Sequence, residues 1–422
     1  MKFIHAADIH LDSPMAGLSA HDEAPVELLR TATRSAFRNL IDCALAEQVD
    51  FVLLPGDVFD TAWRDFNTGM FFVREMARLN AANVRAFVLR GNHDAEHEMT
   101  RSLPLPPNVH VFRADRPDTR QIVVGDLKVA IHGQSFRQAA TTQNLAAAYA
   151  PVEGCLNIAM LHTALEGHAA HAHYAPCTLD QLRNLGMHYW ALGHVHEWDV
   201  LSEAPWVAFS GNLQGRNVRE CGPRGALLVR CEHGELQRPD RLLVDVVRWQ
   251  LARIDVSAAT TRAEVVAQVG EFLEQLLSDA DGRPLACRVV LTGRSPAHAE
   301  LFGQALALRA DLVAQAMIVD RDHLWIEGIR VETQPVLESA TIAARADALA
   351  DLQALLANAS ADPQFVSSLA RDFDPLLAKL PPDVLRQDVP ALHALRRGDL
   401  AALIEEVGPT LIDRIAREPH EH

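Results

Sequence analysis

The stretch FVLLPGDVFD, residues 51–60, joins a short apolar run to two carboxylates. The run at 51–54 is typical of a buried strand, and Gly56 permits a tight turn where that strand ends. Asp57 and Asp60 follow the turn. In layered α/β sheets, ligands bind beyond the carboxyl ends of the strands. The stretch therefore predicts a strand whose carboxyl end carries a functional site.

Four other groups of polar residues also follow short apolar runs. They are Asp8-x-His10, Gly91-Asn92-His93-Asp94, His162, and Gly193-His194-x-His196. Taken singly, each has a plainer explanation, such as a turn, a helix cap or a core histidine. Five such groups, each after a strand, favour one site along one edge of a sheet. Asp, His and Asn side chains bind divalent cations, so the pattern predicts two metal ions and phosphate-ester chemistry.

His93 differs from the other imidazoles because it directly follows Asn92, whose carbonyl oxygen is a neutral metal ligand. We expect Asn92 to face the metals and His93 to face the substrate, where its imidazole can protonate a leaving oxygen. Asp60 is expected to hold this imidazole and keep it cationic. The alternative role for Asp60 is to cap a following helix.

Helical periodicity appears between the strand-like runs, at residues 27–47 and 66–79. This alternation predicts an α/β layered sheet for residues 1–245. After His196 the strand-like runs are separated by Gly, Asn and Pro, which predicts hairpins that close the sheet.

Two further parts follow this domain. Residues 246–333 predict a second, smaller α/β module, in which 261–277 is a helix that begins with a capping box and 317–319 is a strand. Residues 334–422 predict a helical segment, with an Ala- and Leu-rich stretch at 340–356. Packing of this segment on its own domain and binding of a partner through it are both open.

The 422 residues are 49% apolar and contain no run near the ~20 apolar residues of a membrane span. No signal-peptide pattern is evident. The six cysteines are scattered without a CxxC pair, which is typical of reduced thiols. We therefore expect a cytoplasmic protein of two or three domains that does not enter a membrane.

The formal net charge of -16 is not the usual property of a protein that binds nucleic acid alone. Bound metal ions would offset the negative charge of the carboxylates locally. We expect a partner to supply part of the affinity for a nucleic acid. Basic residues cluster after the last metal motif, namely Arg216, Arg219, Arg224 and Arg230, and the first three are candidates for substrate binding. Contacts with substrate phosphates and ordinary solvated loop charges explain them equally well.

The five motifs resemble those of the calcineurin-like metallophosphoesterase superfamily: D-x-H, GDxxD, GNHD/E, a lone H, and GHxH. The resemblance implies an α/β/β/α sandwich of layered sheets. It implies that one metal is held by Asp8, His10, Asp57 and His196. It implies that the second is held by Asp57, Asn92, His162 and His194, with His93 as the catalytic imidazole and Asp60 as its carboxylate partner.

Longer strings resemble the SbcD/YhaO-type DNA-repair nuclease subunits. They are MKFIHAADIHLDSP at 1–14, PGDVFD at 55–60, LHTALEG at 161–167, YWALGHVH at 189–196 and SGNLQGRNVRE at 210–220. This resemblance implies a DNA exonuclease, with endonuclease activity left open, that uses two divalent ions, preferably manganese, in double-strand-break repair. It further implies a DNA-capping role for the second module and docking of the helical segment on an SbcC-like ABC-type coiled-coil ATPase.

Some features and functions stay open. Some relatives carry His at the position of Asp60, which leaves its exonuclease-specific role open. A helix near 66–79 forms a homodimer in such nucleases, and ordinary packing on the sheet is equally expected. The stretch with His168, His171 and His173 is expected to be a polar loop rather than a third metal site. The rival functions are hydrolysis of nucleotides, cyclic nucleotides or other small phosphoesters, and a non-catalytic scaffold.

Overall fold

We describe the fold from a computed structural model of the chain. The described residues are 1–15, 26–60, 66–95, 103–165, 174–336, 348–377, 379, 390–401, 403–404, 407–408 and 411–412. Residues 1–251 with 279–287 form one compact unit, and residues 252–278 with 288–422 form another. The division into three domains at 245 and 333 stays a prediction.

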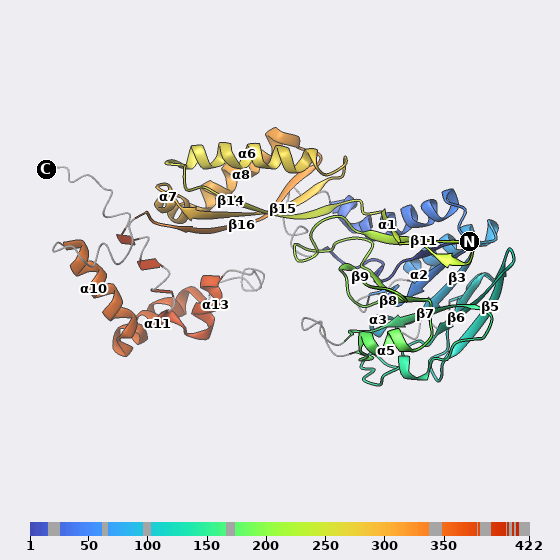
Figure 1. The fold of residues 1–422 in the computed structure, drawn as a ribbon. Coiled ribbons are helices and arrows are strands. Elements are labelled where there is room, and N and C mark those ends of the chain that lie inside the picture. Colours follow the sequence, from blue (N-terminus) through green and yellow to red (C-terminus); the bar gives the residue numbers. More distant parts are fainter. Residues whose placement is uncertain are drawn as a thin grey trace. The chain divides into compact units, whose positions relative to one another are not determined.

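The first unit contains a seven-stranded sheet (Figure 1) with the order β12-β11-β1-β2-β3-β4, in which β13 also pairs with β11. Its strands are β1 (Lys2–His5), β2 (Phe51–Pro55), β3 (Arg85–Leu89), β4 (Val109–Val111), β11 (Gly225–Glu232), β12 (Glu235–Leu236) and β13 (Asp240–Leu243). Strands β1 to β4 are parallel. Asp8, Asp57 and Asn92, which follow β1, β2 and β3, therefore leave the sheet at the same edge.

A six-stranded sheet faces the first, with the order β5-β6-β7-β8-β10-β9. Its strands are β5 (Asp118–Val124), β6 (Leu127–Gly133), β7 (Leu156–His162), β8 (Tyr189–Gly193), β9 (Trp198–Glu203) and β10 (Trp206–Ser210). Strands β6, β7, β8 and β10 are parallel. His162 pairs with Gly193, so His162 and His194 leave neighbouring strands at the same end.

Strand residues alternate between two apolar layers, which explains why the strands are continuous apolar runs in the sequence. Phe3 and Tyr189 lie in the core between the two sheets. Ile4 lies in the core on the outer face of the first sheet, and Trp190 in the core on the outer face of the second. The covering helices are α1 (Val26–Ala46) and α2 (Phe66–Ala81) on the first sheet and α5 (Leu179–Asn184) on the second.

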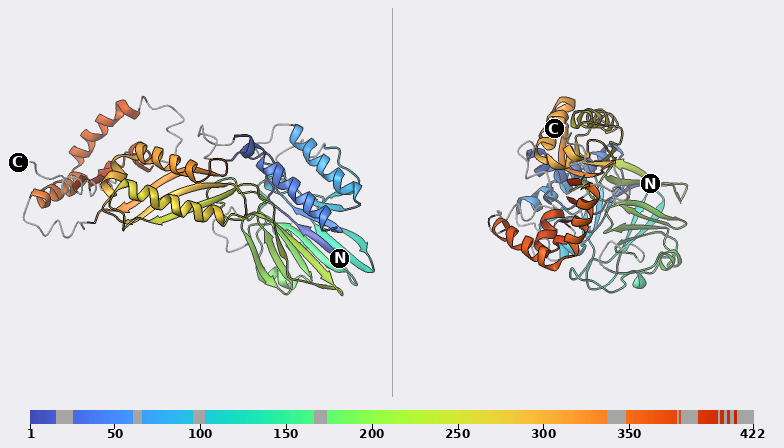
Figure 2. Two further views of the ribbon diagram at one scale, coloured as in Figure 1. Left: turned by 90° about the horizontal axis from the view of Figure 1, so that it is seen from above. Right: turned by 90° about the vertical axis from the view of Figure 1, so that its left-hand side faces the viewer.

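Figure 2 shows α1 and α2 together on one side of the first sheet. The predicted α/β/β/α sandwich is confirmed, and the two helices predicted at 27–47 and 66–79 are present within two residues of their predicted bounds.

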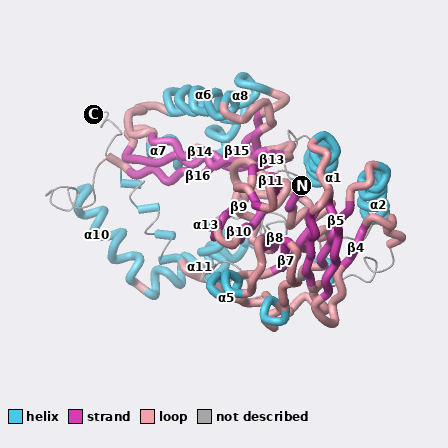
Figure 3. The backbone as a smooth tube through the Cα atoms, turned by 45° about the vertical axis from the view of Figure 1, so that its right-hand side comes forward, coloured by secondary structure: helices cyan, strands magenta, loops and turns pink. Residues whose placement is uncertain are grey.

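The three-stranded sheet β14-β15-β16 and the helices α6 and α8 form a small α/β arrangement (Figure 3). The bounds are β14 (Arg248–Asp255), β15 (Leu285–Arg294), β16 (Leu324–Gln334), α6 (Arg262–Ser278), α7 (His298–Gly303) and α8 (Ala305–Asp320). Thr261 caps helix α6 as predicted, but the return bond of the predicted capping box goes to Thr260, one residue earlier. The Thr261 hydroxyl accepts from Glu264 N–H at 3.3 Å, and the Glu264 carboxylate accepts from Thr260 N–H at 2.7 Å.

The strand predicted at 317–319 is wrong, because these residues belong to α8. Leu308, Leu312 and Ala316 recur at helical spacing and are buried. Their packing continues the helix through residues whose local preference is for a strand.

The C-terminal segment contains α10 (Ala348–Ala361), α11 (Pro363–Leu377) and α13 (Pro390–Arg397), and its described residues form no strand. The predicted helical stretch 340–356 falls partly outside the described residues. Across the described part of the chain, no helix has both the length and the apolar character needed to cross a membrane.

Candidate metal centre

The candidate ligands leave their strands in backbone conformations that L-residues rarely adopt. Asp8, His10, Asp57 and His194 have φ values of 52°, 45°, 52° and 99°. Such conformations cost roughly 1–3 kcal/mol each and persist only where the surroundings hold them. Here the loop after β1 is bound to the loop after β2, because the backbone N–H groups of Ile9 and His10 donate to Asp57 O at 2.9 and 3.0 Å.

Two glycines allow these loops to approach each other. Gly56 has a φ of 103°, and a Cβ at this position would collide with the His162 imidazole. A Cβ on Gly91 would collide with the Asp57 carboxylate. The glycines that precede Asp57 and Asn92 are therefore required by close packing at the site itself.

One cluster of ligand atoms joins both sheets. A carboxylate oxygen of Asp8 and ring nitrogens of His10 and His196 all lie within 4.8 Å of one another. The Nε2 atoms of His10 and His196 are 3.2 Å apart. Asp8 is fixed by the backbone N–H of His194, which donates to both of its carboxylate oxygens at 3.0 and 2.9 Å.

A second cluster lies beside the first. Asp57, His162 and His194 offer ligand atoms within 4.8 Å of one another. His162 Nε2 lies 2.9 Å from Asn92 Oδ1 and 3.4 Å from Asp57 Oδ2. The same Asp57 oxygen lies 3.9 Å from His10 Nε2 in the first cluster. Asp57 thus faces both clusters, as a carboxylate shared between two ions would.

The imidazoles are oriented as metal ligands are. With its Nδ1–H donated to Glu220 Oε1 at 2.8 Å, His196 directs the lone pair of Nε2 toward His10. With its Nδ1–H donated to Pro55 O at 2.9 Å, His162 directs the lone pair of Nε2 toward the Asn92 carbonyl oxygen. A cation between such facing lone pairs replaces repulsion by coordination. The donor set therefore fits two divalent ions.

The charges of the two clusters act on each other. Burial alone would raise the pKa of Asp57, but His162, His10 and His93 outweigh burial and hold the pKa well below its usual range. Burial alone would lower the pKa of His162, but Asp57 and Asp8 outweigh it and raise the pKa to about 9. The carboxylates of Asp57 and Asp8 thus stabilise positive charge at this site, and a bound cation would replace the extra proton of His162.

His93 lies on the short helix α3 (Asn92–Ala95) and forms a third group with His10 and Asp60, whose ligand atoms also lie within 4.8 Å of one another. Because Asp60 binds its Nδ1, we assign His93 to proton transfer rather than to either metal. Its Nδ1 is 3.3 Å from Asp60 Oδ1, and its Nε2 is 4.0 Å from Asp57 Oδ2. The side chain is 29% exposed, so a substrate can reach it. Burial lowers the pKa of His93, but the hydrogen bond to Asp60 and the charge of Asp57 outweigh burial and raise the pKa above its ordinary value.

Comparison with known proteins identifies the family. The model of the calcineurin-like phosphoesterases matches residues 1–198, and that of the metallophosphoesterase YhaO middle domain matches residues 249–334. The uncharacterized metallophosphoesterase YhaO of Bacillus subtilis (strain 168) is 36% identical over 299 residues, which cover 70% of this chain and 72% of that protein. The chain belongs to the calcineurin-like metallophosphoesterases.

Two more distant relatives are named DNA double-strand break repair protein Mre11. The protein of Thermoplasma acidophilum is 27% identical over 267 residues, which cover 59% of this chain and 68% of that relative. The protein of Methanopyrus kandleri is 24% identical over 313 residues, which cover 67% of this chain and 66% of that relative.

The three arginines of this metallophosphoesterase occupy different environments. Arg216 is 15% exposed and lies beside His196, with Nη2 3.2 Å from its Nδ1. Arg219 is exposed. Arg224 is buried, and its guanidinium donates to His196 O at 2.6 Å and to Glu197 Oε1 at 2.6 Å. This placement favours a structural role for Arg224, and the substrate contacts of all three stay predictions.

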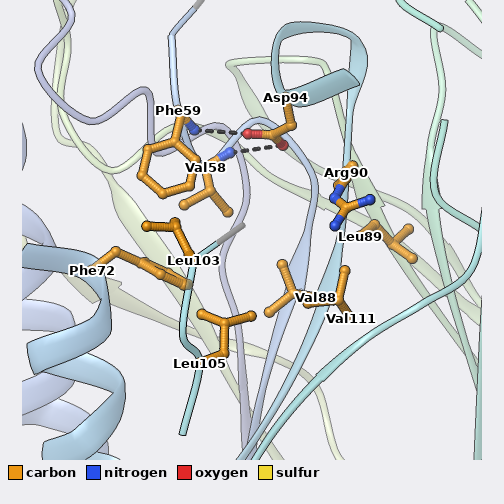
Figure 4. Close-up of a pocket in the computed structure, with 10 residues that line it drawn as sticks. All are labelled: Val58, Phe59, Phe72, Val88, Leu89, Arg90, Asp94, Leu103, Leu105 and Val111. Carbon is orange, nitrogen blue, oxygen red and sulfur yellow. Dashed lines mark hydrogen bonds between the residues drawn. The ribbon is translucent and has the colours of Figure 1, made fainter. Parts of the chain in front are cut away.

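Asp94 completes the tetrapeptide at 91–94, but no role was predicted for it. Its carboxylate accepts from the backbone N–H groups of Val58 at 3.2 Å, Phe59 at 2.9 Å and Gly91 at 3.1 Å. Figure 4 shows Asp94 at the polar end of a pocket whose lining is otherwise apolar apart from Arg90. Asp94 thus ties the loop of Asp57 to the loop of Asn92.

Glu220 was also missed as a functional residue, although the string 210–220 contains it. Its distance of 24 residues from His196 gives no signal of contact. Burial raises the pKa of Glu220, but His196 and Arg216 outweigh burial and keep the pKa well below its usual range, so the group is a carboxylate. His168, His171 and His173 lie outside the described residues.

Proposed function

We propose that this protein is a two-metal DNA phosphodiesterase, an exonuclease with endonuclease activity left open, that acts in double-strand-break repair. The observation that carries the proposal is the convergence of six candidate ligands in two adjacent clusters, with Asn92 against His162 and the His93–Asp60 pair beside them. Together with Asn92, the proposed ligands are Asp8, His10, Asp57, His162, His194 and His196. The family is one of metal-dependent hydrolases, and the names of the Mre11 relatives support DNA as the substrate.

We propose that the divalent ions held by these residues are manganese. The ions would activate water and neutralise the non-bridging oxygens of the phosphodiester. The mixture of carboxylate, amide and imidazole ligands suits such an ion. The protein positions the ligands through strained turns that the neighbouring loops hold in place, as described above for Asp8 and Asp57.

His93 and Asp60 supply proton transfer in this proposal. Asp60 accepts from His93 Nδ1–H, so the ring is held and its cationic form is stabilised. The proton on Nε2 then faces the side of Asp57 and can pass to the leaving oxygen of the phosphodiester. The alternative role of Asp60, capping a following helix, involves residues 61–65, which lie outside the described residues.

A partner is part of the proposal because the chain is acidic. The net charge of -16 disfavours strong binding of DNA by the chain alone. We propose that an SbcC-like ABC-type coiled-coil ATPase docks on the helical segment after residue 333. Co-purification of such an ATPase with the full chain would support this docking, and purification of the full chain without the ATPase would count against it.

The test compares two substrates under the same conditions. With Mn²⁺ present, the full chain is assayed on end-labelled duplex DNA and on bis-p-nitrophenyl phosphate, with Asp57→Ala as the matched control. The proposal predicts metal-dependent cleavage of DNA that Asp57→Ala abolishes. Activity confined to the small ester would favour the rival function as a small-molecule phosphoesterase.

A further inference from the structure

We propose that Glu220 is a positioning residue that holds His196 and Arg216 in one arrangement and shields the metal centre from the charge of that arginine. This inference rests on the proposed function, because it takes His196 as a metal ligand. It explains how the cationic side chain of Arg216 can lie beside a centre that binds metal cations.

The Glu220 side chain is only 10% exposed. Its Oε1 accepts from His196 Nδ1–H at 2.8 Å, which fixes both the tautomer and the direction of the ring. The opposite ring atom, Nε2, then faces His10 in the first cluster. A carboxylate behind a metal-binding imidazole typically contributes 10- to 100-fold to metal affinity or activity.

The remaining contacts fix the carboxylate itself. Its Oε2 accepts from Asn212 Nδ2–H at 3.0 Å and from the backbone N–H of Arg216 at 2.8 Å. Gly215 makes this possible, because a Cβ there would lie 2.5 Å from the Glu220 carbonyl oxygen. The loop between β10 and β11 therefore doubles back and presents Glu220 to His196.

Arg216 binds the same carboxylate. Its Nη2 is 3.0 Å from Glu220 Oε1 and 3.2 Å from His196 Nδ1. Its Nη1 is 3.4 Å from Ser13 Oγ, and Ser13 also hydrogen-bonds to Asp60. The guanidinium therefore contacts a candidate metal ligand on one side and, on the other, the serine that binds the carboxylate partner of His93. A positive charge at this position suits binding of a substrate phosphate.

Such a guanidinium would repel a metal ion held by His196, and a carboxylate in contact with both groups offsets this repulsion. Glu220 is that carboxylate. The geometry thus assigns two effects to one carboxylate, namely orientation of the ring and neutralisation of Arg216. Only the second effect disappears when Arg216 loses its charge, and this difference makes the inference testable.

The experiment is calorimetric titration of Mn²⁺ into the metal-free full chain, without any substrate. Glu220→Gln is expected to weaken Mn²⁺ binding about 10- to 100-fold. Adding Arg216→Gln to this variant is expected to restore about fivefold or more, because the unshielded cation is removed. The matched control is Glu197→Gln, whose carboxylate is 67% exposed and binds Arg224; it should bind Mn²⁺ as the unmodified chain does.

Unchanged Mn²⁺ affinity in Glu220→Gln would overturn the inference, and so would a loss that the second substitution fails to restore. If Glu220→Gln does not fold, Glu220→Asp, which keeps the charge but shortens the side chain that reaches His196, is titrated instead: weaker Mn²⁺ binding supports the inference, and equal or tighter binding overturns it. Because no substrate is present, failure here is distinct from failure to cleave DNA.

Discussion

At the scale of single residues, strain and function coincide. Asp8, His10, Asp57 and His194 all have positive φ, and each carries a candidate ligand. The cost of these conformations is offset by hydrogen bonds between the loops, such as those that Asp57 O accepts. The sequence indicates which residues gather at the site, but it contains no signal of the backbone geometry that aims them.

Replacement of His93 by Ala tests the division between ligands and proton donor. Because His93 belongs to neither of the two proposed ligand sets, His93→Ala should retain both metal ions while the turnover number on DNA falls about 100- to 10,000-fold. Steady-state cleavage of labelled DNA measures this. Full activity in the variant would refute the role assigned to His93.

His5 provides a prediction on pH and stability. It is fully buried between the sheets, where Nδ1 lies 3.0 Å from Tyr189 Oη and Nε2 lies 3.0 Å from Leu192 O. Burial lowers the pKa of His5 to about 3, although the bond to Leu192 opposes this shift. The folded chain thus keeps a neutral ring while the unfolded chain takes up a proton below pH ~6.5.

The stability that follows from this shift is fully present above pH ~6.5 and is lost as the pH falls toward 3. Between pH 7.5 and pH 5 the loss from His5 should be about 2 kcal/mol. Thermal unfolding at both pH values, in the unmodified chain and in His5→Gln, measures it. The variant should lose less stability on acidification, and an equal loss in both proteins would contradict the prediction.

At the scale of elements, local patterns predict most of the sandwich because its strands and helices follow the ordinary hydrophobic periods. The helices α1 and α2 match the predicted stripes, and Thr261 caps α6 as predicted. The strand prediction at 317–319 failed because tertiary packing outweighs local preference there. Burial of Leu312 and Ala316 against the sheet continues α8 beyond the point where local preference changes.

Asp94 ties two of these elements together, and its replacement tests that tie. In the unmodified chain, three backbone N–H groups donate to the two carboxylate oxygens of Asp94. In Asp94→Asn one of these oxygens is replaced by an N–H₂ group, so at least one backbone N–H group loses its acceptor. We expect a loss of roughly 1–3 kcal/mol in the free energy of unfolding. Chemical denaturation followed by circular dichroism measures this loss.

The matched control is Asp115→Asn on the surface, where the carboxylate is 57% exposed and binds Arg113. It should change the free energy of unfolding by less than about 0.5 kcal/mol. Equal stabilities of the two variants would show that Asp94 does not hold the loops.

At the scale of the whole molecule, order along the chain predicts what meets in space. Parallel strands end at one edge, so motifs that are more than 180 residues apart, such as Asp8 and His194, converge. Contacts that depend on how a loop closes were not predictable. Glu220 reaches His196 only because the loop after β10 doubles back, and Arg224 is buried although its charge suggests a surface position.

A two-metal centre in which Asp57 is shared should hold a definite number of ions, so the metal content of the chain is the decisive measurement. The metal-free chain is loaded with Mn²⁺, freed of excess ion, and analysed by plasma mass spectrometry together with Asp57→Ala and His93→Ala. We expect two ions per chain in the unmodified protein and in His93→Ala, and at most one in Asp57→Ala. One ion or none in the unmodified protein, or two in Asp57→Ala, would contradict a two-metal centre that shares Asp57.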